Sequence, residues 1–398
     1  QMCIRDSGDI DRTLMTNMQY QSLRKGNRNM QYKVSIKRKC YLLSVLLMTV
    51  WLTGCVQEEF ESTPSPAGNG IRFTLTVPDV NLPSVSSRTM TGTGTAKKED
   101  EIETVDILVF DMSKTPAVFL EWVSATGVTQ DLADNSTVSF SAVLSPTTAS
   151  TCIVVVANKE LDNIVSGFTK GATTKVEAME KMLHTQTGKW LADGSTTGGY
   201  TRIPMYGEKV ISKITPSMDP ITGINMKRML ARIDIRNNSA TSNFTVEEVY
   251  LANYNTTGYI APAWNTNGQV TDPVPDTPVL PAGSGKKTEE GDAILYSVNG
   301  NTPYDGEIYT FESLAAEDAG GAGADGEASR KDATCLIVKG RIGTGESTFY
   351  RVDFTKNGNT GEQVEYLPLK RNHKYIITIT QALGTGYKSF SEALASYT

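Results

Sequence analysis

The chain has 398 residues, a formal net charge of −6 at pH 7, five cysteines and two histidines. An acidic protein is a poor partner for nucleic acid, because contact with the phosphate backbone requires a basic surface. Two histidines also leave little material for a zinc site, a Ser-His-Asp triad or a Cys-His pair. The composition therefore disfavours a nucleic-acid-binding protein and a histidine-dependent enzyme, and we expect neither a metal nor another cofactor.

The N-terminal part of the chain resembles an export signal. Residues 33–39 are basic, and the uninterrupted apolar run CYLLSVLLMTVWL follows them. This run is typical of the core of a secretory signal and is too short for a spanning helix, which needs about 20 apolar residues. Residues 1 to about 29 resemble no targeting signal, so we expect an artefactual leader before a start at Met30, with Met15 and Met18 as alternatives.

The residues that end the apolar run, LTGC, resemble a lipobox, the sequence at which signal peptidase II cuts before a lipid-bearing cysteine. We therefore expect residues 1–54 to be removed and Cys55 to anchor the protein by its lipid in the outer membrane. A buried helix and a secretory signal without lipid are the alternatives. Glu58 and Glu59 follow the cysteine and resemble the surface-export signal of such lipoproteins.

Residues 55–69 are acidic, contain prolines and have few apolar side chains, which predicts a flexible tether. The run IRFTLTV comes next and alternates apolar with polar residues. A period of two predicts a half-buried strand, which Pro78 would end. The apolar face of this strand consists of Ile71, Phe73, Leu75 and Val77.

The first domain, which we expect to span residues 70–224, contains further strands with turn residues between them, at the spacing of an all-β sandwich. These strands are predicted at 102–110, 117–123, 136–144 and 151–158. The sequence TKVEAMEKMLH adds one short helix, because Val176, Met179 and Leu183 recur at three- and four-residue spacing. Its methionines fit core packing better than a ligand-binding role.

The second domain, expected at residues 225–398, begins with the alternating segment NMKRMLARIDIRN and continues with further predicted strands. Proline- and glycine-rich segments between these strands predict surface loops. No internal repeat of fixed period is visible. Each domain holds one cysteine inside an apolar run, Cys152 in TCIVVVAN and Cys335 in TCLIVKG. We expect two buried free thiols and not a disulfide or a redox site.

Candidate catalytic motifs are weak throughout the sequence. His184 ends the predicted helix and His373 precedes a strand, so capping or solvent-facing roles are the default. The glycine-rich segments GTGTAKK and GAGADG do not connect a strand to a helix, as a phosphate-binding loop requires. We therefore expect no enzyme, although a glycosidase built from carboxylates alone stays an open alternative.

Five segments resemble those of fimbrillins, the subunits of type V pili of Gram-negative anaerobes. In chain order they are SSRTMTG, EDEIETVDILVFD, IPMYGE, RMLARIDI and LKRNHKYIITIT, and they follow the lipobox cysteine, the tether and the first strand. The resemblance covers most of the chain from Cys55 onward. It implies two tandem transthyretin-like β-sandwich domains, so the expected fold class is all-β with one short helix in the N-terminal domain.

The resemblance also implies an assembly route. A trypsin-like, Arg-specific protease cuts the lipidated precursor in the first loop, the first strand is lost, and a C-terminal strand of another subunit fills the groove. Arg88 is the candidate cleavage site, because small and polar residues surround it and let a protease bind the backbone. The alternative is a surface arginine without such a role.

The C-terminal tail, GTGYKSFSEALASYT, is the candidate donor strand, and it is an imperfect one. Read as a strand, it interleaves serines, Lys388 and Glu392 with its apolar residues. The apolar candidates for donation are Tyr387, Phe390, Leu394 and Tyr397. This mismatch leaves open whether the tail is donated whole and whether the chain is a shaft subunit.

The sequence thus predicts a structural pilus subunit that serves adhesion, first as a lipidated precursor at the outer membrane and then in an extracellular fimbrium. Its expected partners are other copies of itself and accessory pilin subunits. A tip or anchor subunit is the alternative within the family. The rival from another class is a monomeric surface lipoprotein that binds glycans by stacking on loop aromatics such as Trp264 and Tyr304.

Overall fold

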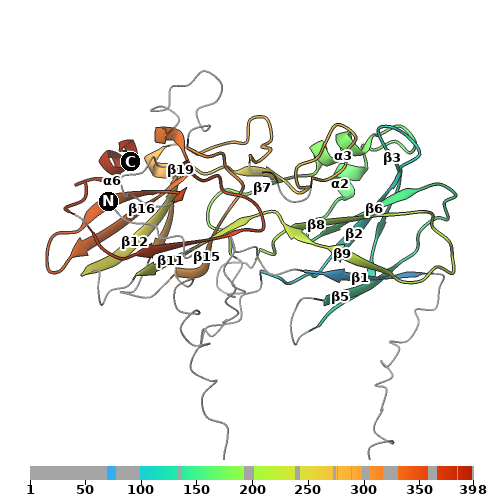
Figure 1. Ribbon diagram of the computed structural model, residues 1–398, viewed down its shortest axis with the longest axis horizontal. Helices are drawn as coiled ribbons and strands as arrows, with labels where there is room; N and C mark the ends of the chain where they lie inside the picture. The colour runs from blue at the N-terminus through green and yellow to red at the C-terminus, as the bar shows by residue number, and fades with distance from the viewer. Residues whose placement is uncertain are drawn as a thin grey trace, which may run out of the picture. The chain divides into compact units, whose positions relative to one another are not determined.

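The computed structural model of the chain describes residues 70–77, 99–131, 137–191, 201–237, 243–271, 275, 277–287, 289–297, 304–316, 330–356, 365–382 and 384–396. These residues belong to one compact unit and form mainly strands (Figure 1). The predicted all-β class is confirmed. None of the described helices combines the length and the apolar character needed to cross a membrane.

The first sandwich consists of a sheet in the order β4-β5-β1-β9 and a sheet in the order β10-β8-β6-β2-β3. Alternate residues of the two sheets face each other and form one apolar core, because successive side chains of a strand point to opposite faces. The strands are β1 (Ile71–Thr76), β2 (Val105–Asp111), β3 (Val118–Ser124), β4 (Thr126–Gln130), β5 (Thr137–Ala142), β6 (Thr151–Ala157), β8 (Met205–Ile211), β9 (Ile221–Asn225) and β10 (Lys227–Arg228). The strands predicted before and after the first loop are confirmed as β1, β2, β3, β5 and β6.

The second sandwich consists of a sheet in the order β15-β11-β20 and a sheet in the order β14-β12-β16-β17. Its strands are β11 (Ala231–Asn237), β12 (Phe244–Ala252), β14 (Ile294–Ser297), β15 (Tyr304–Thr310), β16 (Cys335–Ile342), β17 (Thr348–Asp353) and β20 (Lys374–Ile379). Two short pairs lie outside these sheets: β7 (Leu183–Thr185) with β13 (Thr257–Tyr259), and β18 (Thr355–Lys356) with β19 (Glu365–Tyr366). The chain passes from the first sandwich to the second between Arg228 and Ala231.

The two sandwiches share one topology. Strands β1 and β11 both lie inside their sheets, antiparallel to one neighbour (β5 or β15) and parallel to the other (β9 or β20). In the opposite sheets, β6 lies between β2 and β8, and β16 lies between β12 and β17. A Thr-Cys pair lies at the start of β6 and across the start of β16, which begins at Cys335, and Cys152 and Cys335 are buried free thiols, as predicted. Burial raises the pKa of these thiols to about 11 and about 12, which disfavours the reactive thiolate.

The predicted helix is confirmed as α3 (Lys175–Lys181). The Thr174 hydroxyl accepts a hydrogen bond from the Glu177 amide at 3.2 Å, and the Glu177 carboxylate accepts one from the Thr174 amide at 2.8 Å, which caps the helix. The structure adds α2 (Asp162–Val165), η1 (Glu290–Asp292) and α6 (Phe390–Ala395). Helices this short span fewer than two turns, so they leave no periodic pattern in the sequence. The described part of the first sandwich therefore contains two helices where one was predicted.

Candidate functional site

Strand β1 is hydrogen-bonded on both sides and fills a slot between β5 and β9 (Figure 1). It pairs antiparallel with β5 over its whole length, starting with Ile71 opposite Ala142. On its other side it runs parallel to β9, where Leu75 lies opposite Ile224. Without β1, the backbone groups of β5 and β9 would border an empty groove, and such unpaired edges bind another strand.

One face of β1 belongs to the core of the first sandwich. Its side chains Ile71, Phe73, Leu75 and Val77 are 4%, 1%, 0% and 3% exposed. The Phe73 ring stacks on Phe140 of β5, with ring centroids 4.9 Å apart. At about 1.5–3 kcal/mol for each buried side chain, this face contributes roughly 6–12 kcal/mol to stability. The predicted half-buried strand is therefore confirmed, whereas its removal stays a prediction.

The opposite face of β1 makes no specific bond. Among the described residues, none of its side chains forms a hydrogen bond or an ion pair. Arg72 and Thr76 are exposed to solvent. Strand β1 is therefore held by its backbone ladder and by apolar packing alone, contacts that another strand with the same alternation can reproduce.

Three of the predicted site residues, Cys55, Arg88 and Tyr397, lie outside the described residues. Lipidation of Cys55 and cleavage after Arg88 therefore stay predictions. The described chain stops at Val77 before the first loop and resumes at Glu99 after it. The cleavage candidate thus lies between two segments that the structure does describe.

The chain that follows the first loop is bound from its first described residue. Glu99 is buried, and its carboxylate accepts hydrogen bonds from Arg232 of β11 and from the Tyr309 hydroxyl of β15, both at 2.8 Å. Arg228 of β10 donates to the Glu99 carbonyl at 3.2 Å and forms an ion pair with Asp100. Burial, together with the Glu99 carboxylate, raises the pKa of Tyr309, so its hydroxyl stays a donor. We call Glu99 and Asp100 the acidic strap. The residues that bind it belong to β10, β11 and β15 and not to β1.

The tail is folded onto the second sandwich. Tyr387 pairs through its backbone with Phe349 of β17, and its side chain is exposed. Phe390 and Leu394 both belong to α6, where Phe390 is buried and Leu394 is half-buried. Of the candidate donor residues that the structure describes, two therefore pack within their own chain.

The tail forms a helix where its sequence was read as an imperfect strand. The Ser389 hydroxyl accepts a hydrogen bond from the Glu392 amide at 3.2 Å and caps the N-terminus of α6. A serine followed three residues later by a glutamate is a helix-start pattern, so the sequence did contain the signal. The incomplete apolar alternation obscured it.

The aromatics considered for glycan stacking have different surroundings. The Trp264 ring packs edge-on against Tyr259, with ring centroids 5.0 Å apart, and contacts the core of the first sandwich. Tyr304 belongs to β15, and its side chain lies outside the described part of the structure. Packing of Trp264 against the core is the ordinary role of such a residue and does not favour a sugar site.

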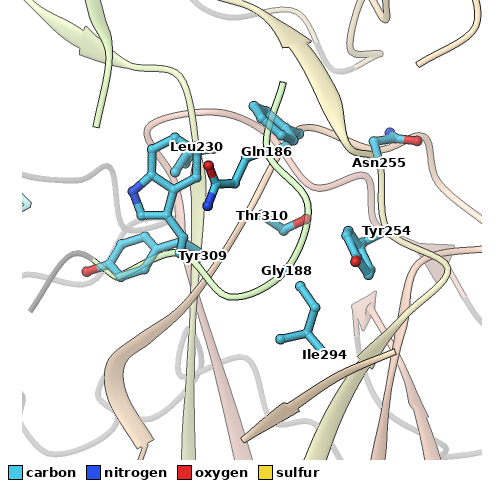
Figure 2. Close-up of a pocket in the computed structure, with 10 residues that line it drawn as sticks. Gln186, Gly188, Leu230, Tyr254, Asn255, Ile294, Tyr309 and Thr310 are labelled. Carbon is cyan, nitrogen blue, oxygen red and sulfur yellow. The ribbon is translucent and has the colours of Figure 1, made fainter. Parts of the chain in front are cut away.

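Figure 2 shows a pocket whose lining includes Tyr254, Asn255 and Tyr309. Trp190 lines it as well. Trp264 is not among the described residues that line it. The space inside it that a water-sized molecule can occupy is about 10 Å³. That is about enough for one water molecule. We therefore assign no ligand to this pocket.

The two histidines lie apart from any cluster that could bind a metal. The described residues contain no group of three or more His, Cys, Asp or Glu side chains suited to a metal ion. His184 packs against Trp190, with ring centroids 5.1 Å apart, and burial lowers the pKa of His184 to about 4. This packed position differs from the predicted capping or solvent-facing one. The Arg371 carbonyl accepts a hydrogen bond of 2.7 Å from the Nδ1 atom of His373.

Comparison with known proteins gives a family match in the first part of the chain. Residues 71–228 match the family described as major fimbrial subunit protein (FimA). No curated protein sequence matches the chain significantly.

Several solved structures cover most of the chain at low identity. The C-terminally truncated tip fimbrial protein Mfa3 from Porphyromonas gingivalis is 16% identical, with a TM-score of 0.43 over 77% of this chain and 94% of that chain. A putative cell adhesion protein from Parabacteroides distasonis is 16% identical, with a TM-score of 0.43 over 81% of this chain and 92% of that chain. A fimbrial assembly protein from the same species is 11% identical, with a TM-score of 0.36 over 78% of this chain and 90% of that chain. Likenesses at this level support no argument about function.

The family match coincides with one part of the fold. It begins at Ile71, the first residue of β1, and ends at Arg228, the last residue of β10. It therefore covers the first sandwich together with the slot that β1 fills. The resemblance to fimbrillins seen in the sequence is confirmed for these residues, which are similar to the FimA major fimbrial subunit family.

Proposed function

We propose that the protein is a structural subunit of a cell-surface pilus, that it serves adhesion, and that it assembles by replacement of β1. One observation supports this proposal: β1 belongs to the domain that matches the fimbrial family, and the described residues hold it by a backbone ladder and apolar packing. The strand can leave without breaking an ion pair. The groove between β5 and β9 then accepts a strand of another subunit by β-strand addition.

The acidic strap supports a cut in the loop that precedes it. Glu99 is bonded to Arg232 and Tyr309, so the chain after Arg88 keeps its anchor when the segment before Arg88 is released. We therefore assign the cut after Arg88 to an Arg-specific, trypsin-like protease, as the resemblance implies. The released segment would carry β1 with it.

The same cut would separate the protein from its membrane anchor. In this proposal signal peptidase II makes Cys55 the first residue, and the lipid on Cys55 holds the precursor in the outer membrane. Cleavage after Arg88 then removes the lipid together with β1 and frees the body for the extracellular fimbrium. Its partners are accessory pilin subunits or other copies of the chain, and the role requires neither catalysis nor a cofactor.

Replacement of Arg88 by alanine tests this proposal. The R88A protein should fold and retain residues 71–77, because its groove is never vacated, whereas the mature wild-type protein should lack residues 55–88. Intact mass of the protein from the cell surface distinguishes the two. The control R72A changes an exposed arginine of β1 and leaves the loop unchanged. SDS-resistant ladders that contain R88A protein in unboiled fimbrial extracts would overturn the proposal.

Replacement of Cys55 by alanine tests the anchor separately. The C55A protein should incorporate no palmitate analogue and should accumulate as an uncut precursor, because no other residue can provide the thioether. Equal labelling of C55A and wild-type protein would rule out the lipoprotein step and leave the proposed strand replacement intact.

A further inference from the structure

The tail closes the free edge of strand β17 in the second sandwich. The Tyr387 amide donates to the Phe349 carbonyl at 2.8 Å, and the Phe349 amide donates to the Tyr387 carbonyl at 2.9 Å. A Cβ atom at Gly386 would lie 2.5 Å from that Phe349 carbonyl, so the close approach requires glycine. The Tyr350 hydroxyl adds a hydrogen bond of 3.0 Å to the Gly384 carbonyl. These contacts make the tail a part of the sheet edge.

Helix α6 covers the outer face of the same sheet. Ala393 is fully buried and Phe390 nearly so. The Phe390 ring packs edge-on against Tyr250 and Phe349, with ring centroids 5.1 and 6.4 Å apart. Cys335 of β16 lies in the same apolar cluster. Removal of α6 would expose this cluster to water.

A buried arginine depends on the end of α6. Arg351 of β17 donates to the Leu394 carbonyl at 2.6 Å, and its Nε atom donates to the Asp353 carboxylate at 2.8 Å. Without the tail, this guanidinium loses the Leu394 carbonyl and keeps the Asp353 carboxylate and the carbonyls of Lys331 and Arg330 as acceptors. Backbone pairing, apolar packing and a hydrogen bond from Arg351 therefore all hold the tail, whereas contacts among the described residues hold β1 by backbone pairing and apolar packing.

The tail also lacks the pattern that the groove requires. The four inward side chains of β1 are at most 4% exposed, so a replacing strand needs a large apolar residue at each position. In extended form the tail places Ser389 and Ser391 on one face and Lys388 and Glu392 on the other. Either face would bury polar or charged groups without partners.

We infer that this chain accepts a strand but does not donate its own tail, so that an extended segment of a different protein fills the groove. The inference rests on the proposed function. The occupant has large apolar residues at four alternate positions. Its second apolar residue is aromatic, because Phe73 stacks on Phe140 in the closed core.

Peptide exchange on the full-length protein, cleaved after Arg88 by an Arg-specific protease that is then inhibited, tests the inference. One labelled peptide has the sequence of residues 70–78 and the other that of residues 382–396. The first peptide with Phe73→Asp is the matched control. We expect the β1 peptide to bind about 100-fold more tightly than either other peptide, because buried polar groups carry a penalty of that size. The cleaved protein alone should form no SDS-resistant ladder.

The outcomes distinguish the inference from the proposed function. Binding of the tail peptide as tight as that of the β1 peptide would overturn the inference, as would a ladder from the cleaved protein alone. Failure of the β1 peptide itself to bind would instead overturn the proposed replacement of β1.

A change inside α6 gives an independent readout of the tail. The F390A variant should unfold at a lower temperature than wild type and bind the β1 peptide as wild type does, because α6 supports the second sandwich and not the groove. The control K388A changes an exposed residue beside α6 and should alter neither property. An F390A variant with wild-type stability and weaker chain-to-chain assembly would contradict the inference.

Discussion

Strands β1 and β11 occupy the same place in the two sandwiches, yet their side chains are bonded differently. Each lies inside a sheet, antiparallel to one neighbour and parallel to the other. Strand β11 carries Arg232 and Asp234, both buried, whereas the buried face of β1 is entirely apolar. If β1 is exchanged as proposed, its place in the sheet does not explain this, because β11 has the same place. The bonds of the side chains are what distinguish the two strands.

Buried charges tie β11 to other segments of the chain. Arg232 forms a two-pronged pair with the Asp234 carboxylate, at 2.8 and 3.0 Å, and also bonds Glu99 of the acidic strap. Lys374 of β20 reaches the Asp234 carboxylate at 2.7 Å. Withdrawal of β11 would leave these charges without partners inside the protein, which is strongly unfavourable. A strand held in this way cannot be replaced by another.

The largest expected effect follows from removal of the central charge of this network. The R232M variant removes the cation that pairs with the buried Glu99 carboxylate and one of the two cations that pair with Asp234, so it should lose about 3–5 kcal/mol of unfolding free energy in urea denaturation. The control R236A changes an exposed arginine of the same strand and should stay within about 0.5 kcal/mol of wild type. Equal stabilities of the two variants would show that the network does not lock β11.

A cavity created in the core by a substitution in β1 should lower the stability only while β1 is in place. In the uncut protein, L75A should lower the free energy of unfolding by about 2–5 kcal/mol, because Leu75 is fully buried. The control T76A changes an exposed residue next to it. After cleavage and loss of β1, L75A and wild type should have the same stability, since the altered residue is gone. A difference that persists after cleavage would mean that β1 stays bound.

Removal of one hydroxyl should weaken the strap by a smaller amount. The Y309F variant deletes the donor to Glu99, and a hydrogen bond to a charged group contributes about 1.5–3 kcal/mol. The control Y387F changes an exposed tyrosine of the tail and should be neutral. Both should exchange a β1 peptide as wild type does. Faster release of β1 from Y309F would show that the strap and β1 are coupled.

Low pH should weaken the ion pairs of β11 and leave the contacts of β1 unchanged. We expect this to be the smallest of the four predicted effects. Burial acts to raise the pKa of Asp234, but Arg232 and Lys374 outweigh it and hold that pKa below its ordinary value. The stability from this pair is therefore complete above the ordinary aspartate pKa of about 3.9 and is lost as pH falls through the lower folded-state value. Unfolding free energies should fall more steeply in wild type than in D234N over that interval. Parallel pH profiles would contradict this assignment.

Strand β1 could be predicted because its sequence signal is local. Its four inward residues lie within one run of seven residues that alternates apolar with polar side chains. A strand places alternate side chains on one face, so this run alone identifies them. Helix α3 was predictable for the same reason, since its apolar spacing is contained within a few turns.

The acidic strap could not be predicted because its partners are distant in sequence. Glu99 and Arg232 are 133 residues apart, and an acidic residue beside Asp100 is typical of a solvated loop. Only the fold brings β11 and β15 to it. Helix α6 did have a local signal in Ser389 and Glu392, but its docking face on β16 and β17 is a tertiary feature. The shared topology was hidden for a similar reason, because only the Thr-Cys segments of β6 and β16 look alike.

The parallel pairing of β1 with β9 sets the order in which the first sandwich can fold. Phe73 lies opposite Ile221, so nearly the whole domain must leave the ribosome before β1 has its second neighbour. Contacts between segments so far apart form slowly, because loop closure costs entropy before the contacts form. We expect the ladder between β1 and β9 to be the last one completed. Exchange of β1 would then repeat a late folding step, with the rest of the sandwich already in place.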